Sequence, residues 1–189
     1  MKSMKFFPIA VLSVMFFACA DFSAYRYYHV YSMVEPSNNY AGMHEDSNLA
    51  FRFDISEKKI KAFITNKSGS DVKLKWSSVK YVDYKGMSHK IANNEVLFTS
   101  RMDKAKDTLL TAGTTEENVI VPIENVEKLD EQWTWSIVPF FDQETDAALL
   151  NKDKTFAVVF PVSLAGEEKT YRFEFKVAEV IPHRYHNPR

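Results

Sequence analysis

The residue in this sequence with the clearest chemical context is its only cysteine, Cys19. Two lysines, Lys2 and Lys5, precede an uncharged and largely apolar run at residues 6–18. A basic head followed by such a run is typical of a secretory signal peptide. The run is too short to cross a bilayer, since a spanning helix needs about 20 apolar residues. We therefore interpret residues 1–18 as a lipoprotein signal peptide that is removed.

Two cleavage sites compete at the end of this leader. Phe16-Phe17-Ala18-Cys19 resembles a bacterial lipobox, in which the cysteine becomes the lipidated first residue, although its two phenylalanines depart from the usual pattern. Ala18-Cys19-Ala20 also fits ordinary signal peptidase, which would cut before Asp21. The apolar run reaches Ala18 without the polar stretch of an ordinary site, so we expect lipidation of Cys19. Because there is no second cysteine, an intramolecular disulfide and a Cys-x-x-Cys site are excluded.

A run of acids is the second candidate for chemistry. Asp142, Glu144 and Asp146, followed by Asp153, imitate the ligand spacing of a calcium-binding loop. Ala147 stands where such a loop needs glycine, and an aspartate replaces the final bidentate glutamate. The three acids are therefore weak metal candidates, and we interpret this segment as a solvated acidic loop.

Aromatic residues form the third candidate. Trp133 and Trp135 fall on one face of an expected strand, where they would stack on sugars if exposed and fill the core if buried. Phe140 and Phe141 follow at the end of that strand. Apolar residues at a loop tip often mark an interaction patch, and the alternative is a loop that folds back to cap the domain. These four residues are the predicted partner or ligand surface.

The remaining patterns do not indicate catalysis. The sequence has no G-x-S-x-G elbow. His183 and His186 lie between prolines, which disfavour the helix that would bring both rings to one face. His44-Glu45-Asp46 lies in a polar loop. We therefore predict no enzymatic activity and no cofactor, with a hydrolase as the least favoured reading.

The composition narrows the class of partner. Without the two leader lysines, 22 basic residues stand against 25 acidic ones in the folded part. Nucleic acid needs a basic face, so it is excluded as a partner. The chain has the length of one ordinary domain.

The elements expected to position these residues are β-strands, because apolar and polar residues alternate with a period of two. The clearest run is Tyr171-Arg-Phe-Glu-Phe-Lys-Val177. Single helical turns are expected near residues 125–131 and 145–150. We predict an all-β fold, a single antiparallel Ig-like β-sandwich. Its strands are expected at residues 51–56, 60–65, 72–76, 79–84, 89–92, 119–123, 133–138, 155–161 and 171–177.

The domain prediction has four parts. The leader covers residues 1–18, and an irregular tether covers residues 19–47, with an edge strand or membrane tether near Tyr25–Val34. The Ig-like sandwich covers residues 48–181, and residues 182–189 form a C-terminal tail. No linker or repeat divides the sandwich.

Three segments support a family resemblance: FITNKSGSDVKLKWSSVKYVDYKGMSHKI, ENVIVPIENV and YRFEFKV. They resemble a group of uncharacterised bacterial envelope lipoproteins, which share an N-K-S/T turn, a tryptophan on the next strand, a V-D-x-x-G turn and a closing aromatic strand. The resemblance spans roughly residues 48–178. It implies an Ig-like envelope domain and assigns no catalytic residue.

We therefore expect a lipoprotein of the bacterial cell envelope, in the outer membrane if the host is Gram-negative, because Ala20 follows the cysteine. It would be a non-catalytic binding or assembly module whose partners are the membrane, through its lipid, and another envelope protein. The alternatives are a periplasmic or secreted protein and a carbohydrate-binding module. The lysine-rich strand at residues 72–76 is a candidate edge for pairing with a partner, or one whose lysines prevent pairing.

Overall fold

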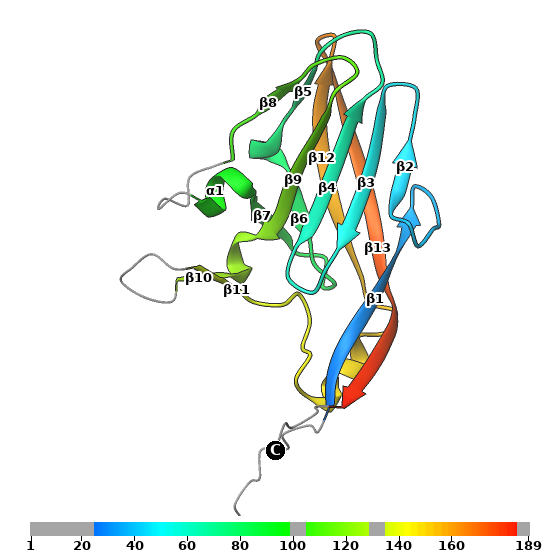
Figure 1. Ribbon diagram of the computed structural model, residues 1–189, viewed down its shortest axis with the longest axis vertical. Coiled ribbons are helices and arrows are strands. Elements are labelled where there is room, and N and C mark those ends of the chain that lie inside the picture. The colour runs from blue at the N-terminus through cyan, green and yellow to red at the C-terminus, as the bar shows by residue number, and fades with distance from the viewer. Residues whose placement is uncertain (1–24, 99–104, 129–134, 185–189) are drawn as a thin grey trace, which may run out of the picture.

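The computed structural model describes residues 25–98, 105–128 and 135–184. Within these ranges the chain is mostly antiparallel β-sheet, with one short α-helix and three 3-10 turns (Figure 1). The predicted all-β class is confirmed, whereas the Ig-like assignment stays a prediction. The strands are β1 Tyr25–Glu35, β2 Met43–Glu45, β3 Leu49–Ile55, β4 Ile60–Asn66, β5 Val72–Leu74, β6 Lys80–Val82, β7 Ser88–Ala92, β8 Thr108–Leu110, β9 Thr115–Pro122, β10 Val126–Lys128, β11 Trp135–Ile137, β12 Thr155–Leu164 and β13 Glu167–Arg184. The helical elements are η1 Trp76–Ser78, α1 Asn94–Phe98, η2 Ile123–Asn125 and η3 Asp146–Asn151.

Two layers of strands pack face to face. The first layer has the order β1-β13-β12-β6, with β5 beside one end of β12 and β8 beside β5. The second layer has the order β9-β4-β3-β2. β7 joins the layers, because its residues 88–90 pair with β6 and its residues 91–92 pair with β9. A strand that switches sheets in this way forms a corner of the sandwich.

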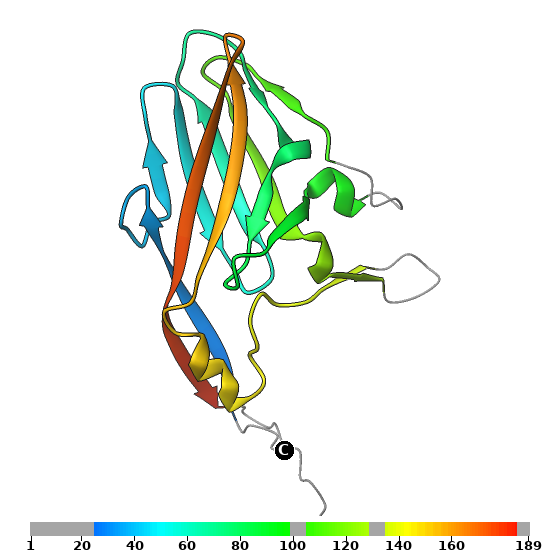
Figure 2. The same cartoon turned by 180° about the vertical axis from the view of Figure 1, so that it is seen from behind.

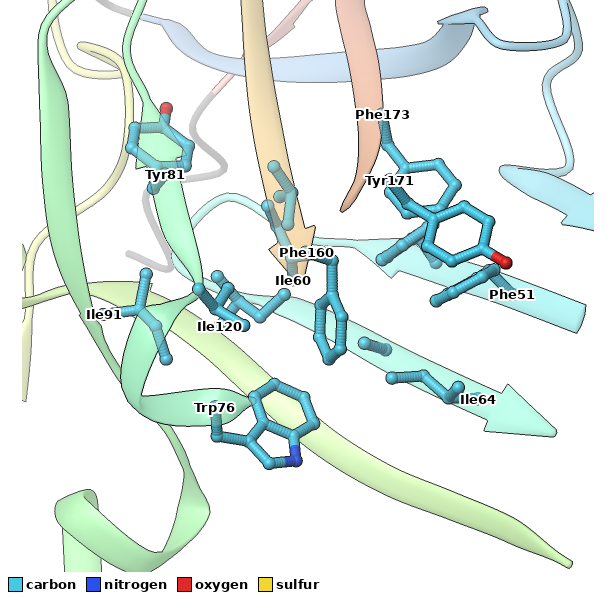
Figure 3. Close-up of a cluster of buried hydrophobic side chains, with 14 of the residues drawn as sticks. Phe51, Ile60, Ile64, Trp76, Tyr81, Ile91, Ile120, Phe160, Tyr171 and Phe173 are labelled. Carbon is cyan, nitrogen blue, oxygen red and sulfur yellow. The ribbon is translucent and has the colours of Figure 1, made fainter. Parts of the chain in front are cut away.

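Aromatic side chains from facing strands fill the space between the layers (Figure 3). Phe51 of β3 has its ring centroid 4.8 Å from that of Tyr171 and 4.7 Å from that of Phe173, both on β13. Phe160 of β12 lies on its other side, at 6.1 Å. Every second residue of a strand faces the same side, so the alternation seen in the sequence directs these rings to the core.

A buried asparagine, Asn66, leads the chain from the second layer to the first. Its side-chain amide donates hydrogen bonds to the carbonyls of Ser70, at 2.8 Å, and Leu110, at 2.9 Å. Its Oδ1 accepts from the backbone N–H of Ser68 at 2.9 Å. The chain then enters β5, which pairs with β12 on one side and β8 on the other. β5 therefore has no open edge, and the expected edge pairing at residues 72–76 is wrong.

Trp76 follows this strand and belongs to the core. It lies in η1 and not on a strand, because β5 ends at Leu74. Its side chain is buried edge-on against Phe160, with ring centroids 4.9 Å apart. Its indole N–H donates to Glu116 at 2.8 Å.

Short elements account for most differences from the sequence prediction. The helical turn expected near residues 125–131 is wrong at residues 126–128, which form β10 and pair with β11, while the 3-10 turn η2 ends at Asn125 and residues 129–131 lie outside the described residues. The turn expected near residues 145–150 is present as η3. β2, β8 and α1 were not predicted, because three to five residues are too few to show a period.

The longest strand, β13, extends beyond the sandwich. Its partner β12 begins at Thr155, opposite Lys176. The rest of β13, to Arg184, pairs with β1 alone and includes three residues that we assigned to the C-terminal tail. This two-stranded extension, the β1–β13 ribbon, ends where Tyr25 pairs with Arg184. We call that end the basal end, and Figure 2 shows η3 beside it.

A histidine between two acids ties η2 to the β6–β7 turn. His89 contacts Asp83 through Nε2 at 3.1 Å and Glu124 through Nδ1 at 3.3 Å. Partial burial acts to lower the pKa of His89, but the two carboxylates outweigh it and raise this pKa above the ordinary 6.5. The contact therefore stabilises the fold fully below pH 6.5, and this contribution is lost as the pH rises through the raised pKa.

We expect His89→Gln to lower the free energy of unfolding by about 1 kcal/mol at pH 5 and by less at pH 9. Urea unfolding at both pH values would measure the difference. The control is His44→Gln, since His44 packs against the Phe173 ring and not between acids. An equal loss at both pH values would contradict the electrostatic account.

Candidate functional site

The candidate site lies along the ribbon, in the segment between β11 and β12. An isolated two-stranded ribbon is marginally stable in water, and this segment covers one side of it. Asn125 holds the start of the segment by donating to the carbonyls of Val138, at 3.0 Å, and Pro139, at 3.1 Å. Its other end is η3, where Tyr27 of β1 donates a hydrogen bond to Asp146.

Phe140 and Phe141 lie near the start of this segment, and both turn toward the sandwich. Phe141 is buried, with its ring centroid 5.6 Å from that of His29. Phe140 is half-buried and stacks on Tyr81 at 5.5 Å. The backbone N–H of Phe140 donates to the carbonyl of Glu57 at 2.9 Å, which fixes the loop against the β3–β4 turn. The loop thus folds back onto the domain.

The same two rings line a pocket of about 380 Å³, which we call the basal pocket. Its other lining residues are Arg26, Lys58, Val138, Pro139, Asp142, Gln143 and Glu144. Three distant parts of the chain therefore meet there: the start of β1, the β3–β4 turn and the segment after β11. This volume is within the usual range of small-ligand sites.

Two buried nitrogens give the basal pocket its chemical character. Arg26 donates from Nη2 to Oε1 of Gln143 at 3.2 Å, which fixes the orientation of the amide. Nε2 of Gln143 and Nε of Arg26 are buried and have no hydrogen-bond partner among the described residues. Leaving a buried donor unpaired costs about 1–3 kcal/mol. Both residues line the pocket, and oxygen acceptors are the ligand groups that would satisfy these two donors.

The three acids of the predicted metal loop point to different partners. Asp142 accepts from the backbone N–H of Glu144 at 2.9 Å and from the Thr145 hydroxyl. Glu144 lies 3.8 Å from Nε of Arg26, and Asp146 accepts from Tyr27. Across the described parts of the chain, no group of three or more His, Cys, Asp or Glu residues could hold a metal ion.

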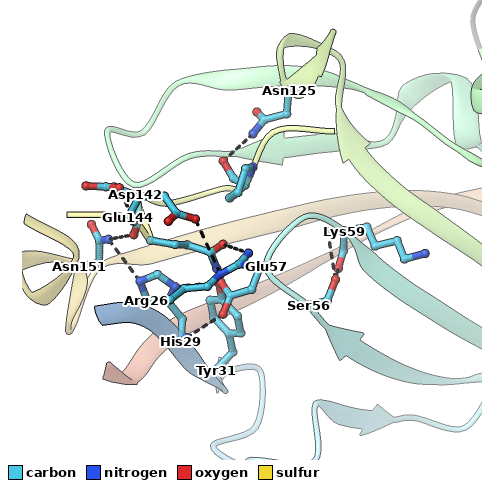
Figure 4. A network of polar contacts seen from close by, with 12 residues as sticks. Arg26, His29, Tyr31, Ser56, Glu57, Lys59, Asn125, Asp142, Glu144 and Asn151 are labelled. Carbon is cyan, nitrogen blue, oxygen red and sulfur yellow. Dashed lines mark hydrogen bonds and ion pairs between the residues drawn. The ribbon is translucent and has the colours of Figure 1, made fainter. Parts of the chain in front are cut away.

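A buried polar network supports the pocket from the side of the sandwich (Figure 4). The side chain of His29 is fully buried. Lys154 donates to Oδ1 of Asn151 at 2.8 Å, so Nδ2 of Asn151 faces Nε2 of His29, at 3.3 Å. Nε2 is then an acceptor, and the proton of the neutral ring lies on Nδ1, which donates to Glu57 at 2.9 Å.

Glu57 is the centre of this network. Besides the ring proton, it accepts from the backbone N–H of His29 at 2.8 Å and from the Tyr31 hydroxyl at 3.2 Å. Partial burial acts to raise the pKa of Glu57, but the hydrogen bonds from His29 and Tyr31 outweigh it and hold this pKa below its ordinary value. Burial and the nearby Glu57 charge raise the pKa of Tyr31 far above its usual range.

The other predicted site residues have different placements. Cys19, Trp133 and His186 lie outside the described residues. Trp135 begins β11, opposite Lys128. Its side chain lies outside what the structure describes, so its stacking role stays a prediction. His183 lies in β13, with its ring edge-on to Tyr28 at 5.8 Å.

Sequence reasoning missed Arg26, His29, Glu57 and Gln143 as site residues. They come from three segments that only the tertiary fold joins, and no spacing along the chain marks them. The one usable signal was the pair Phe140 and Phe141, which line the basal pocket together with Arg26 and Gln143.

Comparison of the chain with protein-family models, with curated proteins and with solved structures finds no match. Among the described residues, no helix has the length and apolar character needed to cross a bilayer.

We expect Glu57→Gln to lower the free energy of unfolding by about 1–3 kcal/mol at pH 7, because buried donors of His29 and Tyr31 lose a charged acceptor. The folded pKa lies below the ordinary 4.5, so the contribution is present above pH 4.5 and is lost as the pH falls through the folded value. Urea unfolding at pH 7 and at pH 3 would measure this difference. Glu179→Gln, an exposed change on β13, should have little effect, and an equally large loss there would contradict the role of the network.

Proposed function

We propose that this chain is a non-catalytic binding module of the bacterial cell envelope, held at the membrane by a lipid on Cys19. Another envelope protein is its proposed partner, and the basal pocket is the proposed binding site. The observation that carries the proposal is the pair of buried donors on Arg26 and Gln143 that have no hydrogen-bond partner among the described residues, with Nε of Arg26 in ion-pair contact with Glu144 at 3.8 Å. They stand beside the apolar surface of Pro139 and Phe140 in a preformed pocket.

The position of the pocket agrees with a lipid anchor. Arg26 lies next to Tyr25, where β1 begins at the basal end. Cys19 and Tyr25 are six positions apart, and a chain of that length reaches at most about 20 Å. A lipid on Cys19 would therefore keep the basal pocket within reach of proteins at the membrane surface.

The buried network supports binding in preference to catalysis. His29, Glu57 and Tyr31 are groups that could transfer protons, but the side chain of His29 is fully enclosed. A general acid or base must come within hydrogen-bond reach of its substrate. Both ring nitrogens of His29 already contact Glu57 and Asn151, which suits a structural role.

The lipid anchor predicts a particular mass. The protein purified from the membranes of its native host should begin at Cys19 and carry an acyl-glyceryl adduct, as measured by intact mass spectrometry. Cys19→Ala should release the protein from the membrane fraction. An unmodified chain that begins at Asp21 would contradict the anchor and leave the binding site to be tested separately.

The binding site predicts position-dependent crosslinking in native membranes. A photo-crosslinking residue at Val138, on the rim of the basal pocket, should give one discrete adduct with an envelope protein. The control probe replaces Leu109, which is more exposed and lies on β8, toward the other end of the sandwich (Figure 1). Gln143→Glu should reduce the Val138 adduct at least tenfold, because it replaces a donor by acceptors. Equal adducts from both positions, or none from Val138, would contradict the proposed site.

A further inference from the structure

A second pocket lies where the two layers fail to close. It has a volume of about 480 Å³, and β1 forms one side while the end of β3 forms the other. We call it the seam. Its lining is His29–Met33 of β1, residues 40–42, residues 53–55 of β3, and Phe175 of β13.

On the β1 side, alternate residues direct their backbone groups into the seam. The N–H of His29 donates to Glu57 at 2.8 Å, and the N–H of Met33 donates to Asn39 at 2.8 Å. Tyr31 lies midway between His29 and Met33. Its backbone N–H and C=O also point into the seam, because every second residue of a strand directs these groups to the same edge. The backbone groups of Tyr31 have no partner across the seam among the described residues.

The β3 side has the same arrangement. The N–H of Ser56 donates to the carbonyl of Lys59 at 3.0 Å across the β3–β4 turn. The alternation therefore turns the backbone groups of Phe53 and Ile55 away from β4 and into the seam. The N–H of Phe53 donates to Gly42 at 2.9 Å, whereas the backbone of Ile55 has no partner across the seam among the described residues.

The chain itself shows what fits between these two edges. Asn39 exchanges two backbone hydrogen bonds with Met33 of β1, at 2.8 and 3.1 Å, and Gly42 then bonds to Phe53 of β3. A tight turn at residues 40–41 thus fills one end of the seam, and the residues on its two sides bond to β1 and to β3. At the other end, the Glu57 side chain closes the gap by bonding to His29. In the middle, no backbone group of the described residues bonds to Tyr31 or Ile55 across the seam.

From this geometry we infer that the middle of the seam binds an extended peptide segment of a partner protein, as an inserted strand that bonds to Tyr31 on β1 and to Ile55 on β3. Only a polypeptide backbone offers alternating donors and acceptors to both edges at strand spacing. His29 and Met33 are four positions apart on β1, which is about 13 Å of strand, so three or four peptide residues fit. The floor consists of buried Met33, Phe53 and Phe175, and it favours one inward apolar residue. This site is separate from the basal pocket and does not depend on the function proposed for it.

The test uses acetyl-Ser-Thr-Val-Thr-Ser-amide, whose single valine fixes the register on the apolar floor. Amide hydrogen exchange is followed by NMR on the protein with increasing peptide. The Tyr31 and Ile55 amides should exchange rapidly in the free protein and become at least tenfold slower with saturating peptide. The amides of Ser32 and Asp54 are internal controls, because they face β13 and β4 and should be protected throughout.

Two methylated peptides test whether both edges are used. In an inserted strand, the N–H of the valine and that of the following threonine point to opposite sides. N-methylation at either position should therefore weaken binding at least tenfold. If one methylated peptide binds as well as the parent, the peptide adds to a single edge and the insertion is refuted.

A pair of proline variants completes the design. Ile55→Pro removes an N–H that faces the seam and leaves the β3–β4 hydrogen bonds intact, so it should weaken peptide binding at least tenfold. Glu45→Pro is the matched control on the outer edge of β2, away from the seam, and should bind as the unchanged protein does. If Ile55→Pro fails to fold, the methylated peptides still test, on the unchanged protein, whether the peptide bonds to both edges.

Other occupants would overturn the inference. Slower exchange of Tyr31 and Ile55 with cellobiose, but not with the peptide, would indicate a sugar site. Protection that rises with protein concentration in the absence of peptide would indicate a second copy of the chain. Unchanged exchange at millimolar peptide would show that the seam does not bind extended peptides.

Discussion

The unequal length of β12 and β13 is the constraint on which the basal half of the molecule depends. β13 continues past the start of β12 and keeps only β1 as a neighbour, and two strands alone cannot bury enough apolar surface to be stable. The segment after β11 supplies the missing cover, with Phe141 against His29 and η3 against β1. The basal pocket follows from this arrangement, because a covering loop packs less regularly than a third strand.

The same arrangement explains why polar groups are buried in this half. A loop brings backbone carbonyls and N–H groups that no sheet ladder satisfies, and these need side-chain partners. Asn151 bonds to the carbonyl of Asp142 at 3.2 Å and also to His29. Glu57 in turn joins His29 to the β3–β4 turn. The network thus links loop, ribbon and sandwich, and it fixes the wall between the basal pocket and the seam.

The sequence allowed the fold class and the position of the long strands to be predicted, but not the way in which they meet. Alternation at Phe51 and Phe53 or at Tyr171 and Phe173 marks an inward face, and the rings do lie there. Alternation shows which way a side chain faces, but not which strand lies beside it. The lysines of β5 therefore did not reveal that this strand crosses to the first layer. That crossing depends on Asn66, a single polar residue whose burial is decided by tertiary contacts. The candidate site was even less accessible, since Arg26 and Gln143 are 117 positions apart.

The bonds between the start of β1 and Gln143 also have a mechanical consequence under the proposed lipid anchor and the proposed partner. Tension applied from Cys19 to a partner in the basal pocket would enter at the first residues of β1 and leave through the segment at Gln143. The bonds from Tyr27 to the carbonyl of Gln143, at 2.9 Å, and from Arg26 to its side chain join these two points directly. The sandwich then lies outside the path of the force, so its two layers could stay packed while the tether is stretched.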